Sequence, residues 1–343
     1  MASYEPMQFR EPMEQSRAPK TAYRDGLDAL IQAREDAFAA ERTRRCADIF
    51  TNATAHRERF CRMLGWPLTE QRMCTPSTAT EEVLGREGDY TILRVHMEVL
   101  PAVVLTGLWF RRAGTDKRPL VLVQHGGLGT PEYIAGFYDG QTANYNHMLE
   151  RLLPYPVDLF APQLLLWNTE TYGEPYDRKA MDARLKRVGS SITAVEVYAL
   201  QRTLDYFQDA HSCFGMIGLS YGGFYTLFTT AIDTRIRSAV SGSFFSSRRE
   251  YPWTDWTWQN AALLYDDAEV ACLCYPRRLC VQMGDHDELF AVKHTQTETK
   301  RVYDYCQSAG VSADWFTCTL FDGTHELCKD DTAIERMMAD LLP

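Results

Sequence analysis

The chain has 343 residues with a net charge of −10, and 45% of its residues are hydrophobic. This content is enough for a substantial core and argues against a disordered protein. The acidic balance disfavours nucleic acid as a partner, because phosphate binding needs a basic surface. No stretch approaches the roughly 18 apolar residues of a membrane helix, so a membrane partner is not expected either.

The N-terminal part of the sequence predicts an appendage to a larger domain. Residues 1–20 are polar, contain proline and are expected to form a flexible arm. Residues 21–85 carry apolar residues at helical spacing, which predicts an extension of two or three helices. The simplest role for such an extension is packing or self-association, so a homo-oligomer could form through the N-terminal helices.

Two features of the sequence favour a cytoplasmic protein. The N-terminus has no apolar segment of the kind found in a secretory signal. The ten cysteines are scattered along a large chain without a C-x-x-C pair, which is typical of reduced and mostly buried thiols.

From residue 86 to residue 343 the pattern becomes an alternation of strands and helices. Eight apolar segments predict strands, at 89–100, 102–112, 119–124, 157–162, 213–218, 236–242, 278–284 and 314–321. Helices are expected near 190–208, from 221, near 289–307 and near 332–342. The alternation predicts an α/β fold with βαβ units, in which helices cover both faces of a mostly parallel sheet.

Two long segments, near 164–189 and 243–265, follow the carboxyl ends of predicted parallel strands. Ligands bind at that edge of open α/β sheets, so both segments are expected to be lid-like insertions. The second segment is rich in aromatic residues that are candidates for lining a substrate pocket: Tyr251, Trp253, Trp256 and Trp258. Packing of the lid against the sheet is the alternative role for these rings.

The stretch FGMIGLSYGGFY, residues 214–225, contains one serine between two glycines. Gly218 and Gly222 flank Ser220 at a spacing of two, between a predicted strand and a predicted helix. This pattern is typical of a nucleophile elbow, a turn too tight for larger side chains at the flanking positions. Ser220 is therefore the predicted nucleophile; the alternative is a tight turn whose serine merely caps the helix.

A serine hydroxyl needs a general base, and for this elbow the chain order is serine, acid, histidine. Three histidines follow Ser220, namely His286, His294 and His325. His294 falls in a predicted helix and His286 in the loop that holds the candidate acids. His325 lies between the last predicted strand and the last helix, and it is the predicted base.

The segment GDHDELF, which follows a predicted strand, offers Asp285, Asp287 and Glu288 as the orienting acid. Asp287 stands three residues after Gly284, a spacing that brings a carboxylate back over the strand end. Asp287 is therefore the predicted acid and Asp285 the nearer rival. Glu288 and Asp255 remain as further alternatives.

Acyl transfer also needs hydrogen-bond donors for the developing oxyanion. The backbone N–H of Tyr221, directly after the nucleophile, is one expected donor. The second should come from the loop that begins HGGL after the third predicted strand, from the amide of Gly127 or Leu128. His125, the first residue of that loop, is expected to shape it at the edge of the substrate pocket.

In combination these motifs resemble those of the α/β-hydrolases. The residues that carry the resemblance are HGG at 125–127, GLSYGG at 218–223, Asp287 and GTHE at 323–326. More narrowly, the chain is similar to the dienelactone-hydrolase-like and acetyl-(xylan)-esterase-like branch over about residues 90–343. The resemblance implies an eight-stranded sheet and a Ser–His–Asp esterase without metal or organic cofactor. The chain departs from dienelactone hydrolases in having serine instead of cysteine as nucleophile, and from acetyl xylan esterases in having His-Gly-Gly where they have Arg-Gly-Gln.

The sequence therefore predicts an enzyme that cleaves a small or medium carboxylic ester, on a sugar or an aromatic alcohol, through an acyl-serine intermediate. A serine peptidase, an amidase or a lactonase on the same fold is the first alternative. A catalytically silent scaffold is the second, because function depends on the site and not on the fold.

Overall fold

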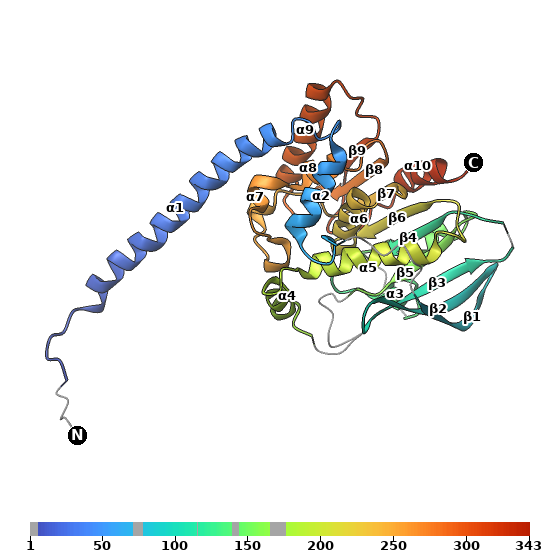
Figure 1. Cartoon of the computed structure of the whole chain (residues 1–343), viewed down its shortest axis with the longest axis horizontal. Coiled ribbons are helices and arrows are strands. Elements are labelled where there is room, and N and C mark those ends of the chain that lie inside the picture. The colour runs from blue at the N-terminus through green and yellow to red at the C-terminus, as the bar shows by residue number, and fades with distance from the viewer. Residues whose placement is uncertain (1–5, 71–77, 115, 139–143, 165–175) are drawn as a thin grey trace.

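The computed structural model describes residues 6–70, 78–114, 116–138, 144–164 and 176–343. Its centre is a nine-stranded sheet in the order β1-β2-β3-β5-β4-β6-β7-β8-β9 (Figure 1). The strands are β1 (Ala79–Glu87), β2 (Tyr90–Leu100), β3 (Val103–Arg112), β4 (Leu120–Gln124), β5 (Asp158–Pro162), β6 (Phe214–Leu219), β7 (Ile236–Gly242), β8 (Arg278–Gly284) and β9 (Phe316–Phe321). The pairs β1–β2, β2–β3 and β3–β5 are antiparallel, and all pairs from β5 to β9 are parallel.

Helices cover both faces of the sheet, as the sequence predicts. The described α-helices are α1 (Met13–Arg45), α2 (Ala53–Leu64), α3 (Pro131–Ile134), α4 (Arg178–Lys186), α5 (Ile192–Phe207), α6 (Tyr221–Ile232), α7 (Ala261–Leu264), α8 (Asp267–Cys272), α9 (Val292–Ala309) and α10 (Thr332–Leu341). Short 3₁₀ helices lie at η1 (Glu150–Leu152), η2 (Arg248–Glu250) and η3 (Thr254–Trp256).

Successive residues of β4 contribute to two different hydrophobic cores, because side chains alternate across a strand. Leu120 and Leu122 belong to the core beneath α2, α5, α6, α8 and α9. Val121 and Val123 belong to the core beneath α3 and α10. A strand buried on both faces reads as a continuous apolar run, and the sequence segment PLVLVQ has that form.

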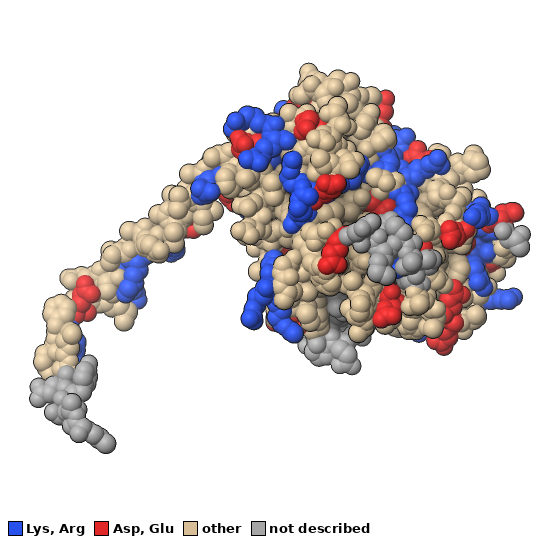
Figure 2. All heavy atoms as spheres, in the orientation of Figure 1, with Lys and Arg blue, Asp and Glu red and all other residues tan. Residues whose placement is uncertain are grey.

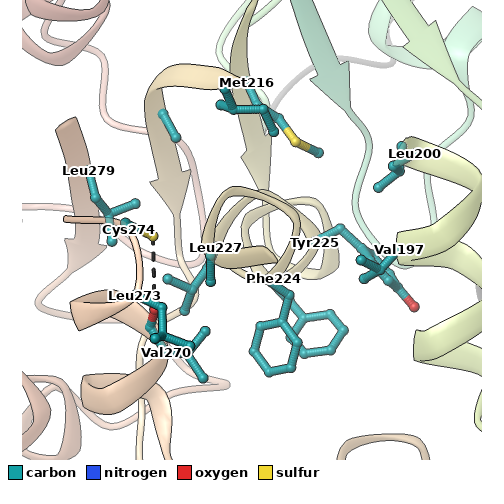
Figure 3. Packing of buried hydrophobic residues seen from close by; sticks show 14 of the residues in the cluster. Val197, Leu200, Met216, Phe224, Tyr225, Leu227, Val270, Leu273, Cys274 and Leu279 are labelled. Carbon is teal, nitrogen blue, oxygen red and sulfur yellow. Dashed lines mark hydrogen bonds between the residues drawn. The ribbon is translucent and has the colours of Figure 1, made fainter. Parts of the chain in front are cut away.

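The larger core is centred on α6, the helix that follows the predicted elbow. Figure 3 shows side chains converging on α6 from α5, β6, β8, α8 and the turn after α8: Val197, Leu200, Met216, Leu279, Val270, Leu273 and Cys274. The Cys274 thiol donates to the Val270 carbonyl at 3.9 Å. Packing on all sides fixes the start of α6, and with it the position of Ser220.

The eight predicted strands are all present, and β1 is a ninth that the sequence analysis assigned to the helical extension. This edge strand is exposed along most of its length and is rich in charged residues. Natural edge strands often carry charges that prevent pairing with other chains, and such a strand lacks the apolar alternation that reveals a strand in sequence. Helix α1 also begins earlier than expected, at Met13, inside the segment expected to be a flexible arm.

The two N-terminal helices have different relations to the body of the protein. Phe60 of α2 is fully buried and packs edge-on against Phe228 of α6 at 5.1 Å. Helix α1 has 33 residues and is therefore about 50 Å long. The C-terminal end of α1 contacts α7, and the rest of α1 extends away from the sheet (Figure 1). Arg42 anchors that end in an ion pair with the buried Glu269 at 3.3 Å.

The described residues also bear on two sequence predictions, the absence of a membrane helix and the presence of reduced cysteines. No helix among them is long and apolar enough to cross a lipid bilayer. All the cysteines in the described ranges are free thiols.

We predict that α2 contributes to the stability of the fold and that the exposed part of α1 does not. Phe60→Ala removes a fully buried ring and should lower the free energy of unfolding by about 3–5 kcal/mol. Gln32→Ala, on the exposed part of α1, should change it by less than about 0.5 kcal/mol. Urea unfolding followed by circular dichroism measures both values, and equal losses would contradict the packing described here.

Candidate active site

Ser220 lies in a strained turn between β6 and α6. Its φ of 60° and ψ of −122° are unusual for a residue with a side chain. Its backbone N–H donates to the Gly242 carbonyl of the neighbouring strand at 2.8 Å, which holds the turn against β7. The serine occupies the N-cap position of α6, yet its side chain makes no capping hydrogen bond. The helix-capping alternative therefore does not account for this hydroxyl.

The glycines around Ser220 are required by close backbone contacts. A Cβ at Gly218 would lie 2.4 Å from the carbonyl carbon and oxygen of Gly222. A Cβ at Gly222 would lie 2.1 Å from the carbonyl oxygen of Gln124, at the end of β4. Both distances are far below van der Waals contact, so the turn can close over β4 only if these side chains are absent.

His325 and Asp287 form a hydrogen-bonded pair beside this turn. His325 lies in the loop after β9, and its Nδ1 is 2.8 Å from Oδ2 of Asp287. The Asp287 carboxylate is fully buried, and its Oδ1 accepts the backbone N–H groups of Leu289 and Phe290 at 2.8 and 2.9 Å. These amides fix the carboxylate, so the imidazole has a defined orientation and a protonated Nδ1.

The other three carboxylates that were considered have different partners. Asp285 accepts the Gly323 N–H at 3.3 Å and is largely exposed. Glu288 accepts the backbone N–H of His325 and not its ring. Asp255 is buried and accepts from the guanidinium of Arg178 at 2.8 Å. Of the four, the side chain of Asp287 is the one that contacts the imidazole.

Ser220 and His325 open onto the same cavity, which has a volume of about 470 Å³. The cavity also contains four residues that the sequence predicted for the oxyanion site or the pocket: Tyr221, Gly127, Leu128 and Trp253. Four segments that are distant in sequence therefore meet at the carboxyl edge of the sheet, as expected for a ligand site in an open α/β sheet.

No protein-family model matches the sequence, and no curated protein matches it either. Solved structures do match. A candidate acetyl xylan esterase from Bacteroides fragilis superposes with a TM-score of 0.63 and 16% identity, covering 78% of this chain and 74% of that one. A glucuronoyl esterase from Solibacter usitatus gives 0.62 and 12% over 86% and 93%. Acetyl xylan esterase 1 from Thermoanaerobacterium sp. gives 0.56 and 11% over 85% and 94%.

The chain has the α/β-hydrolase fold. The antiparallel start of the sheet, the parallel strands β4 to β9 and the turn at Ser220 all fit this description. The sheet has nine strands, one more than the resemblance implied, because β1 extends its antiparallel edge.

His125 does not line the cavity, contrary to the prediction that it lies at the edge of the substrate pocket. It is fully buried, its Nδ1 donates to the Gly126 carbonyl at 2.8 Å and its Nε2 accepts the Leu164 N–H at 3.2 Å. Burial lowers the pKa of His125 to about 4, so the ring is neutral. It joins the HGGL loop to the end of β5, which agrees with the expected loop-shaping role.

Three of the four aromatic pocket candidates are also placed elsewhere. Trp256 and Trp258 are buried in the core, where their rings contact Phe224 at centroid distances of 5.7 and 6.4 Å. Tyr251 accepts the Ala291 N–H at 2.9 Å. Trp253 lines the cavity and stacks on Trp256 at 4.4 Å. The prediction that these rings line the pocket is therefore wrong for Tyr251, Trp256 and Trp258, which have the alternative role of packing the lid. Trp253 is the one of the four that lines the cavity.

The sequence analysis missed several cavity residues: Asn144, Tyr145, Lys179, Leu289 and Phe290. Leu289 and Phe290 stand two and three residues after Asp287, so the loop that carries this acid could have suggested them. Lys179 belongs to α4, inside the predicted insertion 164–189, of which residues 165–175 lie outside the described ranges. Nothing in the local sequence around Tyr145 indicates a site residue.

A buried ionic network connects both insertions to the elbow helix. The fully buried Arg178 of α4 donates to Asp255 of η3 at 2.8 Å and to Glu196 of α5 at 3.0 Å. The Tyr221 hydroxyl donates to the same Asp255 carboxylate at 2.7 Å. A buried cation left without its carboxylates would be strongly destabilising, so these contacts position α4 and η3 over the start of α6.

One surface cluster in the described ranges has metal-ligand composition. Ligand atoms of Asp285, His286 and Asp322 lie within 4.8 Å of one another, and all three side chains are exposed. None of them lines the cavity. The cluster is therefore separate from the pocket that contains Ser220 and His325.

We predict that the Nδ1 proton of His325 is bonded to Asp287 and not to Asp285. A charge-assisted hydrogen bond of this length should give a downfield proton NMR resonance. The resonance should disappear in Asp287→Asn, which removes the carboxylate charge, and remain in the matched variant Asp285→Asn. Loss in Asp285→Asn with retention in Asp287→Asn would reassign the partner of the imidazole.

Proposed function

We propose that the protein is a serine hydrolase that cleaves a carboxylic ester through an acyl-serine intermediate, with Ser220, His325 and Asp287 as its catalytic triad. The observation that supports this most directly is the joint placement of two features. Ser220, in a strained turn and without a capping bond, lines the same cavity as His325, and the imidazole of His325 is bonded to the buried Asp287 carboxylate. A serine hydroxyl becomes a useful nucleophile when a base takes its proton and a third group orients that base.

In this mechanism Ser220 Oγ attacks the ester carbonyl carbon while Nε2 of His325 takes the hydroxyl proton. Asp287 keeps the Nδ1 proton in place and stabilises the imidazolium that forms. Collapse of the tetrahedral intermediate breaks the ester C–O bond, and the imidazolium gives its proton to the departing alcohol. A water molecule, deprotonated by His325, then attacks the acyl carbon. Collapse of this second intermediate breaks the bond to Ser220 Oγ, which takes the proton back from the imidazolium as the acid is released.

The oxyanion of each tetrahedral intermediate would be bound by backbone N–H groups at the rim of the cavity. Tyr221 supplies one from the first turn of α6, where the helix dipole also favours negative charge. The HGGL loop supplies the other from Gly127 or Leu128, both of which line the cavity. Each such donor contributes about 3–4 kcal/mol to catalysis in comparable sites.

The cavity supports a small or medium ester. A volume of about 470 Å³ lies at the lower end of the range for small-molecule pockets, which is ~300–1,000 Å³. Trp253 and Phe290 give it aromatic walls, and such rings can stack on a sugar or an aromatic alcohol. The structural neighbours include an acetyl xylan esterase and a glucuronoyl esterase, which supports an ester carried on a sugar.

A peptidase, amidase or lactonase would use the same residues, and a silent scaffold would use none of them. Ester hydrolysis is favoured because the reported structural neighbours are esterases. The scaffold alternative leaves the strain at Ser220 unexplained, since a backbone outlier of this kind costs about 1–3 kcal/mol and is usually kept for function.

The proposal predicts one activated serine. Treatment with a fluorophosphonate probe should add a single adduct to the wild type, and peptide mapping by mass spectrometry should place it on Ser220. Ser220→Ala should show no adduct and should lose about 10⁴-fold or more of its turnover of a chromogenic acetate ester. Ser308→Ala, on the exposed surface of α9, is the control and should behave as the wild type. Equal ester hydrolysis by Ser220→Ala and wild type would reject the mechanism.

We further propose that the protein works in the cytoplasm. The free cysteines of the described ranges are mostly buried, and burial raises the pKa of the Cys46 thiol to about 12 and that of Cys274 to about 11. Such thiols are neutral and unreactive. Free thiols are typical of reducing compartments.

We also propose that α1 mediates self-association with a second copy of the chain. Its outer part exposes large apolar side chains at spacings that place them near one face of the helix: Tyr23, Leu27, Leu30 and Ile31. Basic residues lie at the N-terminal end of this stripe, at Arg17, Lys20 and Arg24, whereas Glu35 and Asp36, which also pair with Arg249, follow it. An antiparallel second copy would cover the stripe and bring opposite charges together, and Figure 2 shows this part of α1 standing clear of the body.

The α1 proposal predicts an oligomer that charges in the stripe would dissociate. The double variant Leu27→Asp with Leu30→Asp should elute as a smaller species in size-exclusion chromatography with light scattering, because two carboxylates cannot be buried against a second copy. Gln32→Asp adds a charge at an exposed position outside the stripe and should leave the oligomer intact. A monomeric wild type at micromolar concentration would refute self-association.

A further inference from the structure

We propose that the hydroxyl of Tyr145 is a third oxyanion donor, which acts beside the backbone amides during attack by Ser220. This inference rests on the proposed function, because it assigns a residue to the same reaction. Tyr145 lines the cavity and is 3% exposed. It comes from the connection between β4 and β5, 17 residues after the end of the HGGL loop and far in sequence from the elbow.

The hydrogen bonds of this hydroxyl leave its proton available. The Gly126 N–H donates to the Tyr145 oxygen at 2.7 Å and so occupies one of its two lone pairs. Across the described parts of the chain, no group accepts the Tyr145 proton. A buried donor without an acceptor is uncommon, because leaving it unpaired costs about 1–3 kcal/mol. A bound ligand oxygen in the cavity would supply the missing acceptor.

The Tyr145 hydroxyl lies next to the nucleophile. A methyl group built on Gly126 would be 3.1 Å from the Tyr145 oxygen and 3.3 Å from Ser220 Cβ, so the two side chains flank one small space. A methyl group built on Gly129 would be 2.3 Å from the same oxygen. The glycines of the HGGLG segment therefore leave room for the hydroxyl beside Ser220, which is a physical reason for glycine at both positions.

The segment that carries Tyr145 is fixed to the loop of the catalytic base. The Leu327 N–H donates to the Asn144 carbonyl at 2.9 Å, and the Asn146 side chain donates to the Glu326 carboxylate at 2.8 Å. The Tyr145 ring also packs edge-on against Tyr133 at 5.6 Å. A side chain held on three sides costs little reorganisation when charge develops on the ligand, and this is the condition for effective oxyanion stabilisation.

Burial keeps this group a donor over the working pH range. It raises the pKa of Tyr145 well above its ordinary value, and the Gly126 N–H opposes that shift. The phenol therefore stays protonated at neutral pH.

A merely positioning role is the competing explanation, in which Tyr145 acts by accepting from Gly126 and so aligns the HGGL loop. Tyr145→Phe removes both functions. It should lower kcat on an acetate ester by about 10²–10³-fold, with KM changed much less, if the hydroxyl acts in the transition state. Tyr303→Phe removes an exposed hydroxyl on α9 that does not line the cavity, and its kcat should match that of the wild type. An unchanged kcat in Tyr145→Phe would overturn the proposal.

Ring fluorination separates the two roles by the sign of the effect. Replacing Tyr145 by 3-fluorotyrosine or 3,5-difluorotyrosine keeps the shape but makes the hydroxyl a stronger donor and a weaker acceptor. A direct donor predicts that kcat is maintained or raised at neutral pH. As the pH rises, kcat should then fall at a lower pH than in the wild type, because the fluorinated phenol ionises earlier. A positioning residue predicts that kcat decreases with each fluorine at every pH, and that result would overturn the donor role.

The fluorophosphonate adduct distinguishes failure of this inference from failure of the proposed function. If the wild type is labelled on Ser220 and Tyr145→Phe retains full turnover, the triad stands and the Tyr145 assignment is wrong. If the wild type is not labelled at all, both proposals are rejected together.

Discussion

The structure depends on the close approach of the β6–α6 turn to the end of β4. No Cβ fits at Gly222, because the carbonyl of Gln124 would be 2.1 Å away. This approach brings the HGGL loop, which continues directly from Gln124, next to Ser220. It also forces Ser220 into a positive φ, so its side chain leaves the sheet toward the cavity instead of folding back onto α6. One steric constraint thus sets the position of Ser220, the start of α6 and the separation between Ser220 and the HGGL loop.

The surrounding elements hold that arrangement through buried polar contacts. Arg178, Asp255 and the Tyr221 hydroxyl tie the two insertions to the elbow helix on one side of the cavity. Asn146 and Glu326 tie the segment before β5 to the loop that carries His325 on the other side, in a part-buried contact. The contacts of Arg178 are buried, so breaking them would leave unsatisfied polar groups. The cavity is therefore bounded by loops whose relative positions are fixed before a ligand binds.

The N-terminal extension divides into two parts with different physical roles. Helix α2 supplies Phe60 to the main core, so it belongs to the hydrolase body although it precedes the sheet in sequence. Helix α1 is anchored at one end by Arg42 and carries exposed apolar residues over the rest of its length. A helix that buries so little of itself gains little from tertiary packing, which is the usual source of helix stability in proteins.

The sequence by itself determined the features that local patterns encode. The apolar runs predicted eight strands, and the glycine spacing around Ser220 predicted the turn, because both are properties of a few neighbouring residues. The candidate base and acid followed from their positions after predicted strands, and the structure places His325 and Asp287 2.8 Å apart across 38 residues of chain. The polar edge strand β1 was missed because it buries too little to show an apolar period.

Tertiary structure decided what depends on contacts between distant segments. Four aromatic residues within eight positions look equivalent in sequence, yet packing directs Trp253 to the cavity and Trp256 to the core. The sequence around Tyr145 gives no sign of a site residue. Its proposed role depends on the positions of Gly126 and Ser220, which only the folded structure brings next to its hydroxyl. A local pattern can specify a turn or a strand, but which side chains share a cavity is set by how the elements pack.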